Sequence, residues 1–327
     1  MLIPPESHAG WKIWTLGDDI AWLHMDDEGR LRAINPEAGY FGVVPGTNEK
    51  TNKNAYDMIQ NGTIFTNVAT TADNEPWWED KKTGTPATDW QGRRYDPSTG
   101  PAAHPNSRFT VSAKQNRSYS KLADAPSGVP ISAIVFGGRR KEIAPLVYEA
   151  KDWAHGVLVG ASVGSETTAA AIGDVGIVRR DPMAMKPFCG YNFADYWTHW
   201  LSFADRSEEL PGIFHVNWFR QDDDGKFLWP GFGENLRVLR WIIDRCEKRT
   251  GAVETAIGFL PKPSDIDTNG LDIPDDIMQS LLSIDIDQWK AEMASVGEYL
   301  ESYGDQLPVT LKRECEAVID QLGRSAV

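Results

Sequence analysis

Short apolar runs, bounded by glycine, proline, asparagine or aspartate, recur along the chain. Runs of roughly four to eight residues between such turn signals are typical of strands. They predict strands at residues 11–16, 20–24, 31–34, 63–69, 129–136, 156–161 and 213–219. The turn signal Asp222-Asp223-Asp224-Gly225 follows the last run, and its glycine is free to adopt a positive φ, so we expect a hairpin there.

Longer segments have helical spacing, in which apolar residues recur every three or four positions. They predict helices at residues 54–60, 145–153, 192–205 and 234–248, and a mainly helical region at 274–322. The apolar stripe of the 234–248 segment consists of Leu239, Ile242, Ile243 and Cys246. The stripe of the C-terminal region consists of Trp289, Met293, Val296 and Leu300. Before it, Asp285 with Gln288 resembles the capping box that begins a helix.

This alternation of strands and helices predicts a mixed α/β (α+β) fold with mixed sheets and a helical C-terminal segment at residues 274–327. Residues 71–105 form a long polar stretch, which is typical of a functional loop or an insertion. Residues 162–173 are small and bounded by glycines, so they bury little. They predict either a lid, more mobile than the 234–248 helix, or an ordinary surface helix and loop.

The composition is ordinary for a globular protein, with 41% hydrophobic and 24% charged residues among 327. A formal net charge of −14 disfavours a nucleic-acid backbone or an anionic membrane as partner. A single nucleotide remains possible, because a local arginine pair can outweigh the global charge. The start lacks a signal-peptide pattern, and the three cysteines form no Cys-x-x-Cys motif. We therefore expect a cytoplasmic protein with reduced thiols.

One segment, residues 218–235, gathers aromatic residues around a polar turn and ends on an amide. Phe219, Phe227 and Phe232 could form a slot for a flat ring, and Asn235 could read the edge of that ring through its donor and its acceptor. The alternative is a hairpin that packs its aromatic side chains into the core.

Two further groups could bind ions. Asp18 and Asp19 follow a predicted strand, where paired carboxylates can hold Mg²⁺ or Mn²⁺, although Gly-Asp-Asp is also an ordinary turn. Asn106 and Arg108 would share one face of an extended segment. Arg139 and Arg140 follow two glycines; such arginines could bind carboxylate or phosphate, or form surface salt bridges. The six histidines have no metal-ligand spacing, and no P-loop motif is present.

The segment Phe-Leu-Trp-Pro-Gly-Phe-Gly-Glu-Asn, residues 227–235, resembles the guanine-binding segment of GTP-dependent phosphoenolpyruvate carboxykinase. Segments at residues 17–22, 64–69, 104–109, 136–140 and 214–220 are similar to that family in the same order. The similarity runs from about Gly10 to the C-terminus, but it covers only about the C-terminal half of the family's protein. Met1 is therefore interpreted as a truncated start.

The resemblance implies that residues 1–327 are a C-terminal nucleotide-binding domain truncated at its N-terminal edge. The parent enzyme would convert oxaloacetate and GTP to phosphoenolpyruvate, CO₂ and GDP, a step of gluconeogenesis. The family's P-loop, its lysine and histidine metal ligands and one substrate-binding arginine would lie upstream of this chain. We expect a monomeric parent, and a fragment that is inactive alone and prone to self-association.

The resemblance also assigns roles to individual residues. Asp19 would bind the catalytic Mn²⁺ and Asp18 would lie near the nucleotide-bound Mg²⁺. Asn106 and Arg108 would bind a carboxylate of oxaloacetate or phosphoenolpyruvate, and Arg139 would reach the γ-phosphate, so the two arginines are the catalytic candidates. The guanine pocket would consist of Trp218, Phe219, Phe227, Phe232 and Asn235. The lid would include Ser165, Glu166 and Thr168.

Two other classes of protein stay open from the residues alone. A carbohydrate-active protein would explain the thirteen tryptophans and the acidity, with Asp18 or Asp19 as one of two catalytic carboxylates. It would not explain the Gly-Gly-Arg-Arg segment. A non-catalytic nucleotide-binding module would bind a nucleotide without turning it over.

Overall fold

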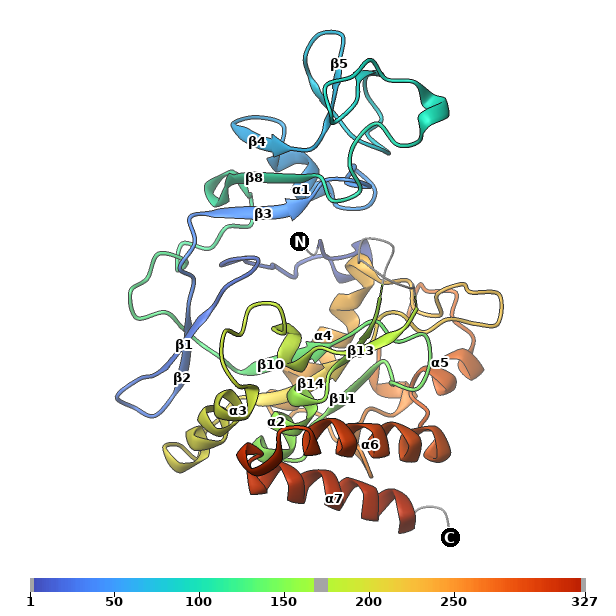
Figure 1. Cartoon of the computed structure of the whole chain (residues 1–327). Helices are drawn as coiled ribbons and strands as arrows, with labels where there is room; N and C mark the ends of the chain where they lie inside the picture. Colours follow the sequence, from blue (N-terminus) through green and yellow to red (C-terminus); the bar gives the residue numbers. More distant parts are fainter. Residues whose placement is uncertain (1–2, 168–175, 325–327) are drawn as a thin grey trace. The chain divides into compact units, whose positions relative to one another are not determined.

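The computed structural model describes residues 3–167 and 176–324 (Figure 1). The chain forms two compact units. Unit 1 consists of Met1–His24 and Arg32–Pro130, and unit 2 consists of Met25–Leu31 and Ile131–Val327. The description of residues 1–327 as one nucleotide-binding domain stays a prediction.

Unit 1 is built around an antiparallel sheet of three strands in the order β3-β8-β4. These strands are β3 (Gly39–Val43), β8 (Arg108–Ser112) and β4 (Thr63–Thr66). One face of the sheet is buried, and it packs Tyr40, Phe109 and Val111 against Met58 and Trp78. Helix α1 (Lys53–Met58) supplies Met58; the Asn52 side chain caps it by accepting a hydrogen bond from the backbone N–H of Ala55.

Two smaller sheets complete this part of the chain. Strands β1 (Trp22–Met25), β2 (Leu31–Ile34) and β9 (Val129–Pro130) pair in the order β1-β2-β9. Strands β5 (Ala69–Thr71), β6 (Pro76–Trp77) and β7 (Pro86–Thr88) pair in the order β6-β5-β7. The stretch predicted as a long polar loop therefore contains a small sheet.

Unit 2 has a mixed sheet of five strands in the order β10-β14-β11-β16-β15. The strands are β10 (Ala133–Gly137), β14 (Gly212–Val216), β11 (Val147–Glu149), β16 (Gly258–Leu260) and β15 (Val253–Thr255). Strands β10 and β14 are parallel, whereas the other neighbouring strands are antiparallel. The central strands are largely apolar, as expected for strands with both faces covered.

Helices surround this sheet. They are α2 (Trp153–Ala161), α3 (Phe193–Leu201), α4 (Asn235–Cys246), α5 (Asp275–Leu281), α6 (Ile286–Glu301) and α7 (Val309–Arg324). Helices α6 and α7 lie side by side, and α7 also contacts α2 (Figure 1). A separate pair, β12 (Gly164–Glu166) and β13 (Val178–Arg180), flanks the segment that the structure does not describe. Within the described ranges, no helix combines the length and the apolar character that crossing a bilayer requires.

The mixed α/β fold with a helical C-terminal segment is confirmed. Strand β2 has the predicted bounds, and all four residues of the α6 stripe are buried. The Asp285 side chain caps α6 by accepting from the backbone N–H groups of Asp287 and Gln288. The hairpin turn is also confirmed, since Gly225 has φ +79° and its N–H donates to the carbonyl of Asp222.

The predictions for residues 145–161 were wrong, because helix and strand are exchanged. Residues 147–149 form β11 and pair with β14, and the apolar run 156–161 belongs to α2. Asp152 starts this helix, since its side chain accepts from the backbone N–H of His155. The run is buried on every side, and periodicity does not distinguish a fully buried helix from a buried strand.

Two further predictions need correction. Residues 11–16 form no strand; the pattern there yields only an isolated bridge between Thr15 and Tyr119. The buried face of α4 is centred on Val238, Trp241 and Ile242 rather than on the predicted stripe, of which only Ile242 is fully buried. The predicted stripe is displaced by one position from the buried face, so it omits Val238 and Trp241.

Candidate functional site

Two glycines at the end of β10 determine where Arg139 lies. A Cβ atom on Gly137 would lie 2.6 Å from the Val216 carbonyl oxygen, and one on Gly138 would lie 2.3 Å from that of Gly164. Only residues without a side chain permit this approach. The backbone N–H of Arg139 donates to Ser165 Oγ (3.1 Å), and its carbonyl accepts from Glu166 N–H (2.8 Å). Arg139 is therefore attached to the first part of the predicted lid.

The side chain of Arg139 is exposed and lies over an aromatic ring. Its guanidinium carbon is 5.5 Å from the centre of the Phe219 ring, within the range of a cation–π contact. Phe227 lies edge-on to Phe219, with 6.0 Å between ring centres and a 73° interplanar angle. Three of the predicted nucleotide-binding residues are thus in contact, although they lie up to 88 positions apart in the sequence (227 − 139).

Phe232 and Asn235 lie at the start of α4. Gly231 and Phe232 both have positive φ, and the Phe232 side chain is 67% exposed. A left-handed conformation at a bulky residue costs on the order of 1–3 kcal/mol and is a feature of ligand clamps. Phe232 makes no ring contact with Phe219 or Phe227 in the described chain, whereas Asn235 Oδ1 accepts from Trp229 Nε1 at 2.9 Å.

Trp218 faces a different environment from the exposed rings. It is half-buried and packs against the core cluster that contains Val216 and Trp229. This packing suits a structural side chain. The binding of a nucleotide by Trp218 stays a prediction.

The predicted lid is described only in part. Ser165 and Glu166 belong to β12, and Glu166 Oε1 accepts from the backbone N–H of Lys141 at 2.7 Å. Thr168 and the rest of residues 168–173 lie outside the described residues, so the lid stays a prediction.

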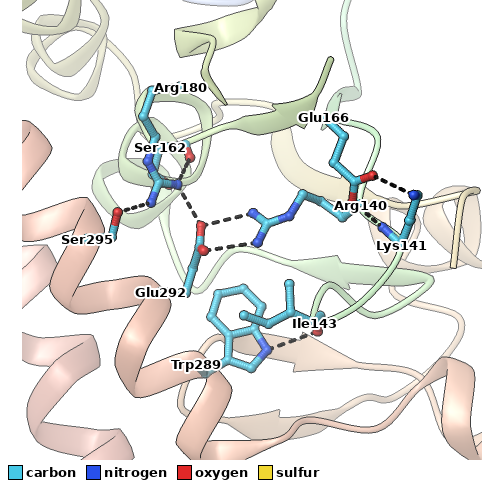
Figure 2. A network of polar contacts seen from close by, with 9 residues as sticks. All are labelled: Arg140, Lys141, Ile143, Ser162, Glu166, Arg180, Trp289, Glu292 and Ser295. Atoms are coloured by element: carbon cyan, nitrogen blue, oxygen red, sulfur yellow. Dashed lines mark hydrogen bonds and ion pairs between the residues drawn. The ribbon is translucent and has the colours of Figure 1, made fainter. Parts of the chain in front are cut away.

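A partly buried ion network joins the described strands beside this segment to α6 (Figure 2). Glu292 of α6 accepts two hydrogen bonds from Arg140, both 3.0 Å, and one from Arg180 at 2.6 Å. Arg180 also donates to the Ser162 carbonyl and to Ser295 Oγ. We call Arg140, Arg180 and Glu292 the Glu292 clamp. For Arg140 the structure favours the salt-bridge interpretation over the anion site, because its guanidinium pairs with Glu292 and its side chain is only 12% exposed.

In unit 1, Asp18 and Asp19 line a hollow of about 440 Å³ together with residues 14–17 and 33–35. Asp18 Oδ2 accepts from the backbone N–H of Phe41 at 3.1 Å. Although Asp18 is solvent-exposed, partial burial of its carboxyl group raises its pKa; the Phe41 hydrogen bond opposes this shift and the charge of Glu37 adds to it. A nearby cation would favour the charged form of such a carboxyl group.

Asn106 and Arg108 also lie in unit 1, at the start of β8. Arg108 Nε donates to Asn106 Oδ1 at 2.9 Å, which confirms that the two side chains share a face. The Arg108 guanidinium lies 5.4 Å from the centre of the Phe41 ring. Two of the side chains predicted to bind a substrate carboxylate are therefore in contact.

Two side chains that contact the candidates or their neighbours have no role predicted from the sequence. Trp229 lies within the segment 227–235 that resembles the family's guanine-binding segment, and its indole N–H donates to the Asn235 amide oxygen. Glu292 carried no motif, yet it pairs with Arg140 from a helix 152 positions away. The only sequence signal for the contact of Trp229 with Asn235 is their spacing of six residues across Pro230-Gly231. No sequence signal exists for the contact of Glu292 with Arg140.

The fold is that of a mixed α/β protein, and the contacts bring an arginine together with two aromatic rings of the candidate nucleotide site. The family model described as "Phosphoenolpyruvate carboxykinase C-terminal P-loop domain" matches residues 1–321. The chain belongs to this family. The assignment gives no support to a carbohydrate-active protein.

Relatives named "Phosphoenolpyruvate carboxykinase [GTP]" are similar over almost the whole chain. The protein of Anaeromyxobacter dehalogenans (strain 2CP-1) is 52% identical over 325 residues, which are 98% of this chain and 54% of the relative. That of Chlamydia muridarum is 50% identical over 326 residues, with the same shares. That of Renibacterium salmoninarum is 51% identical over 320 residues, 96% of this chain and 53% of the relative. The chain spans about half the length of the curated relatives it matches.

Proposed function

We propose that this chain is the C-terminal part of a cytoplasmic GTP-dependent phosphoenolpyruvate carboxykinase that serves gluconeogenesis. The whole enzyme converts oxaloacetate and GTP to phosphoenolpyruvate, CO₂ and GDP. The observation that carries the proposal is the contact of Arg139 with the Phe219–Phe227 pair, in a chain whose curated relatives have that name.

Each candidate has a role in this reaction. The aromatic rings stack on the guanine base, the Asn235 amide pairs with its edge, and Arg139 binds the γ-phosphate. Asn106 and Arg108 hold a carboxylate of the substrate. Loss of CO₂ from oxaloacetate leaves an enolate, whose oxygen attacks the γ-phosphorus while GDP leaves. Such catalysis depends on positioning and on charge stabilisation, which the arginines supply.

The Asp18–Asp19 pair would hold a divalent cation. Carboxylate oxygens suit Mn²⁺ and Mg²⁺, and a raised pKa at Asp18 fits a carboxyl group that gains from a cation. In residues 3–167 and 176–324, no three histidine, cysteine, aspartate or glutamate side chains converge into a group that could hold a metal ion. The bound cation supplies positive charge that stabilises the enolate.

Base preference provides the test. Asn235→Ala removes the amide that pairs with O6 and N1–H of guanine, and lost hydrogen bonds of this kind weaken binding by about 3–10-fold. We expect calorimetry to show this loss for GDP and a smaller loss for ADP. The control is Asn269→Ala, since Asn269 is an exposed residue of the same unit. Equal losses for both nucleotides would remove the basis of the guanine assignment.

A further inference from the structure

The hydrogen bond between Trp229 and Asn235 fixes the orientation of the Asn235 carboxamide. An indole N–H is a donor and never an acceptor, so the amide oxygen must face Trp229. The Nδ2 group then points the other way, and it makes no hydrogen bond within the described part of the chain. Rotating the amide by 180° would place two N–H donors against the indole N–H.

Trp229 itself has little freedom to follow such a rotation. It is 1% exposed and packs in the core cluster of unit 2 with Val238 and Trp241. Its ring therefore presents the N–H at a fixed place beside the first turn of α4, where Asn235 begins the helix.

The orientation of the amide decides which base it matches. Guanine offers an acceptor at O6 beside a donor at N1, and adenine offers a donor at N6 beside an acceptor at N1. An amide that flips freely pairs with either edge, because it carries one donor group and one acceptor. An amide held in one orientation matches only one of the two bases.

We propose that Trp229 is a specificity-determining positioning residue, which holds the Asn235 amide in the orientation that accepts guanine and rejects adenine. The inference rests on the proposed function for the assignment of Asn235 to the base. It adds that the preference depends on a core residue that does not itself touch the nucleotide.

The chain offers a matched pair of tryptophans for the experiment. Trp241 is also 1% exposed and belongs to the same core cluster, but its Nε1 has no hydrogen-bond partner among the described residues. Trp229→Phe and Trp241→Phe each replace an indole by a smaller ring in the same core. Only the first removes a hydrogen bond to Asn235.

Calorimetry on the wild-type chain and both variants would use GDP, IDP and ADP. IDP keeps O6 and N1–H but lacks the 2-amino group, so it isolates the edge that Asn235 reads. We expect Trp229→Phe to lower the ratio of ADP to GDP dissociation constants by about 3–10-fold. The ADP to IDP ratio should fall equally, and Trp241→Phe should keep both ratios.

The outcomes separate the inference from the proposed function. If the wild-type chain prefers GDP and Trp229→Phe keeps the full preference, the inference is overturned and the guanine assignment stands. A wild-type chain that binds GDP and ADP equally, or binds neither, overturns the proposed function and the inference with it. Equal falls in the ratio for both variants mean that general loosening of the core is the cause, and this also overturns the inference.

If Trp229→Phe does not fold, the wild-type chain with ¹⁵N-labelled indoles answers the same question by NMR. We expect the Trp229 indole N–H resonance to shift with GDP and IDP and to stay protected from exchange. A resonance that responds equally to ADP, or to none of the three, contradicts the proposal.

Discussion

Two buried histidines make the stability of this chain sensitive to mild acid. Burial lowers the pKa of His215 to about 4, and the neighbouring Arg140 adds to this effect. Burial also lowers the pKa of His155 to about 4, with a contribution from Lys151. Both values are below the ordinary pKa of about 6.5, so the folded protein keeps both rings neutral while the unfolded chain protonates them. The resulting stabilisation is complete above about pH 6.5 and is lost as the pH falls toward 4.

His215→Phe tests this dependence. The substitution keeps a ring to stack on Tyr148, which lies 5.1 Å from His215 between ring centres, and it removes one titrating group. We expect the free energy of unfolding to fall less steeply between pH 7 and pH 5 in the variant than in the wild type. Denaturant titrations at several pH values give this slope. The exposed His199→Phe is the control, and an unchanged slope in His215→Phe would contradict the assignment.

At the residue scale, the sequence predicted contacts that depend on short spacing or on a motif. Asn106 and Arg108 were expected on one face, and they are hydrogen-bonded. The sequence did not predict that Asn235 bonds to Trp229. No sequence pattern distinguishes a buried tryptophan that donates a hydrogen bond from one that only packs. Trp241 shows the difference, since its equally buried indole N–H has no hydrogen-bond partner in residues 3–167 and 176–324.

At the scale of elements, the Glu292 clamp joins α6 to strands and loops far away in the sequence. Burial alone would raise the pKa of Glu292, but the hydrogen bonds and charges of Arg140 and Arg180 hold it below the usual value. The carboxylate therefore stays charged at neutral pH, and its interactions are lost only as the pH falls below the pKa range of an ordinary glutamate.

Glu292→Gln should weaken the attachment of β12 and β13 to α6. The substitution leaves two largely buried guanidinium groups without a counter-charge, and such a loss destabilises proteins by about 3 kcal/mol. We expect faster amide hydrogen exchange in β12 and β13, together with a lower free energy of unfolding. Glu298→Gln, at an exposed position of the same helix, should change neither. Exchange rates in β12 and β13 that match the wild type would show that the clamp does not hold these strands.

The sequence predicted elements best where amphipathic spacing was strong. The α6 stripe and its cap followed from one buried face and one polar face. The predicted secondary structure of residues 145–161 was wrong because α2 and β11 are both buried. Neither element has a polar face that would reveal a helical or a strand periodicity. The parallel pairing of β10 with β14 joins residues about eighty positions apart, and no local pattern encodes that register.

At the scale of the whole molecule, the chain carries about half of its relatives' length and no P-loop motif. We expect it to bind GDP weakly and to form no phosphoenolpyruvate from oxaloacetate and GTP. The reason is that the sequence has no P-loop motif to donate backbone hydrogen bonds to the phosphates, and that no group of three or more metal-ligating side chains forms in the described residues. Calorimetry with GDP and a coupled assay for phosphoenolpyruvate give the two measurements. GTP-dependent turnover by this chain alone would show that the essential residues are assigned wrongly.

The close approach at Gly138 limits how this protein can evolve. The two nearest atoms that a side chain at position 138 would meet are the backbone O and C of Gly164, so no rotamer change nearby can make room for it. A single mutation to any other amino acid must push β10 and β12 apart, and a compensating substitution at 164 cannot help because that residue is already glycine. We therefore expect glycine to be retained at position 138, whereas at Gly190 a Cβ would meet no atom within 4 Å beyond its chain neighbours in the described residues, so other amino acids fit there.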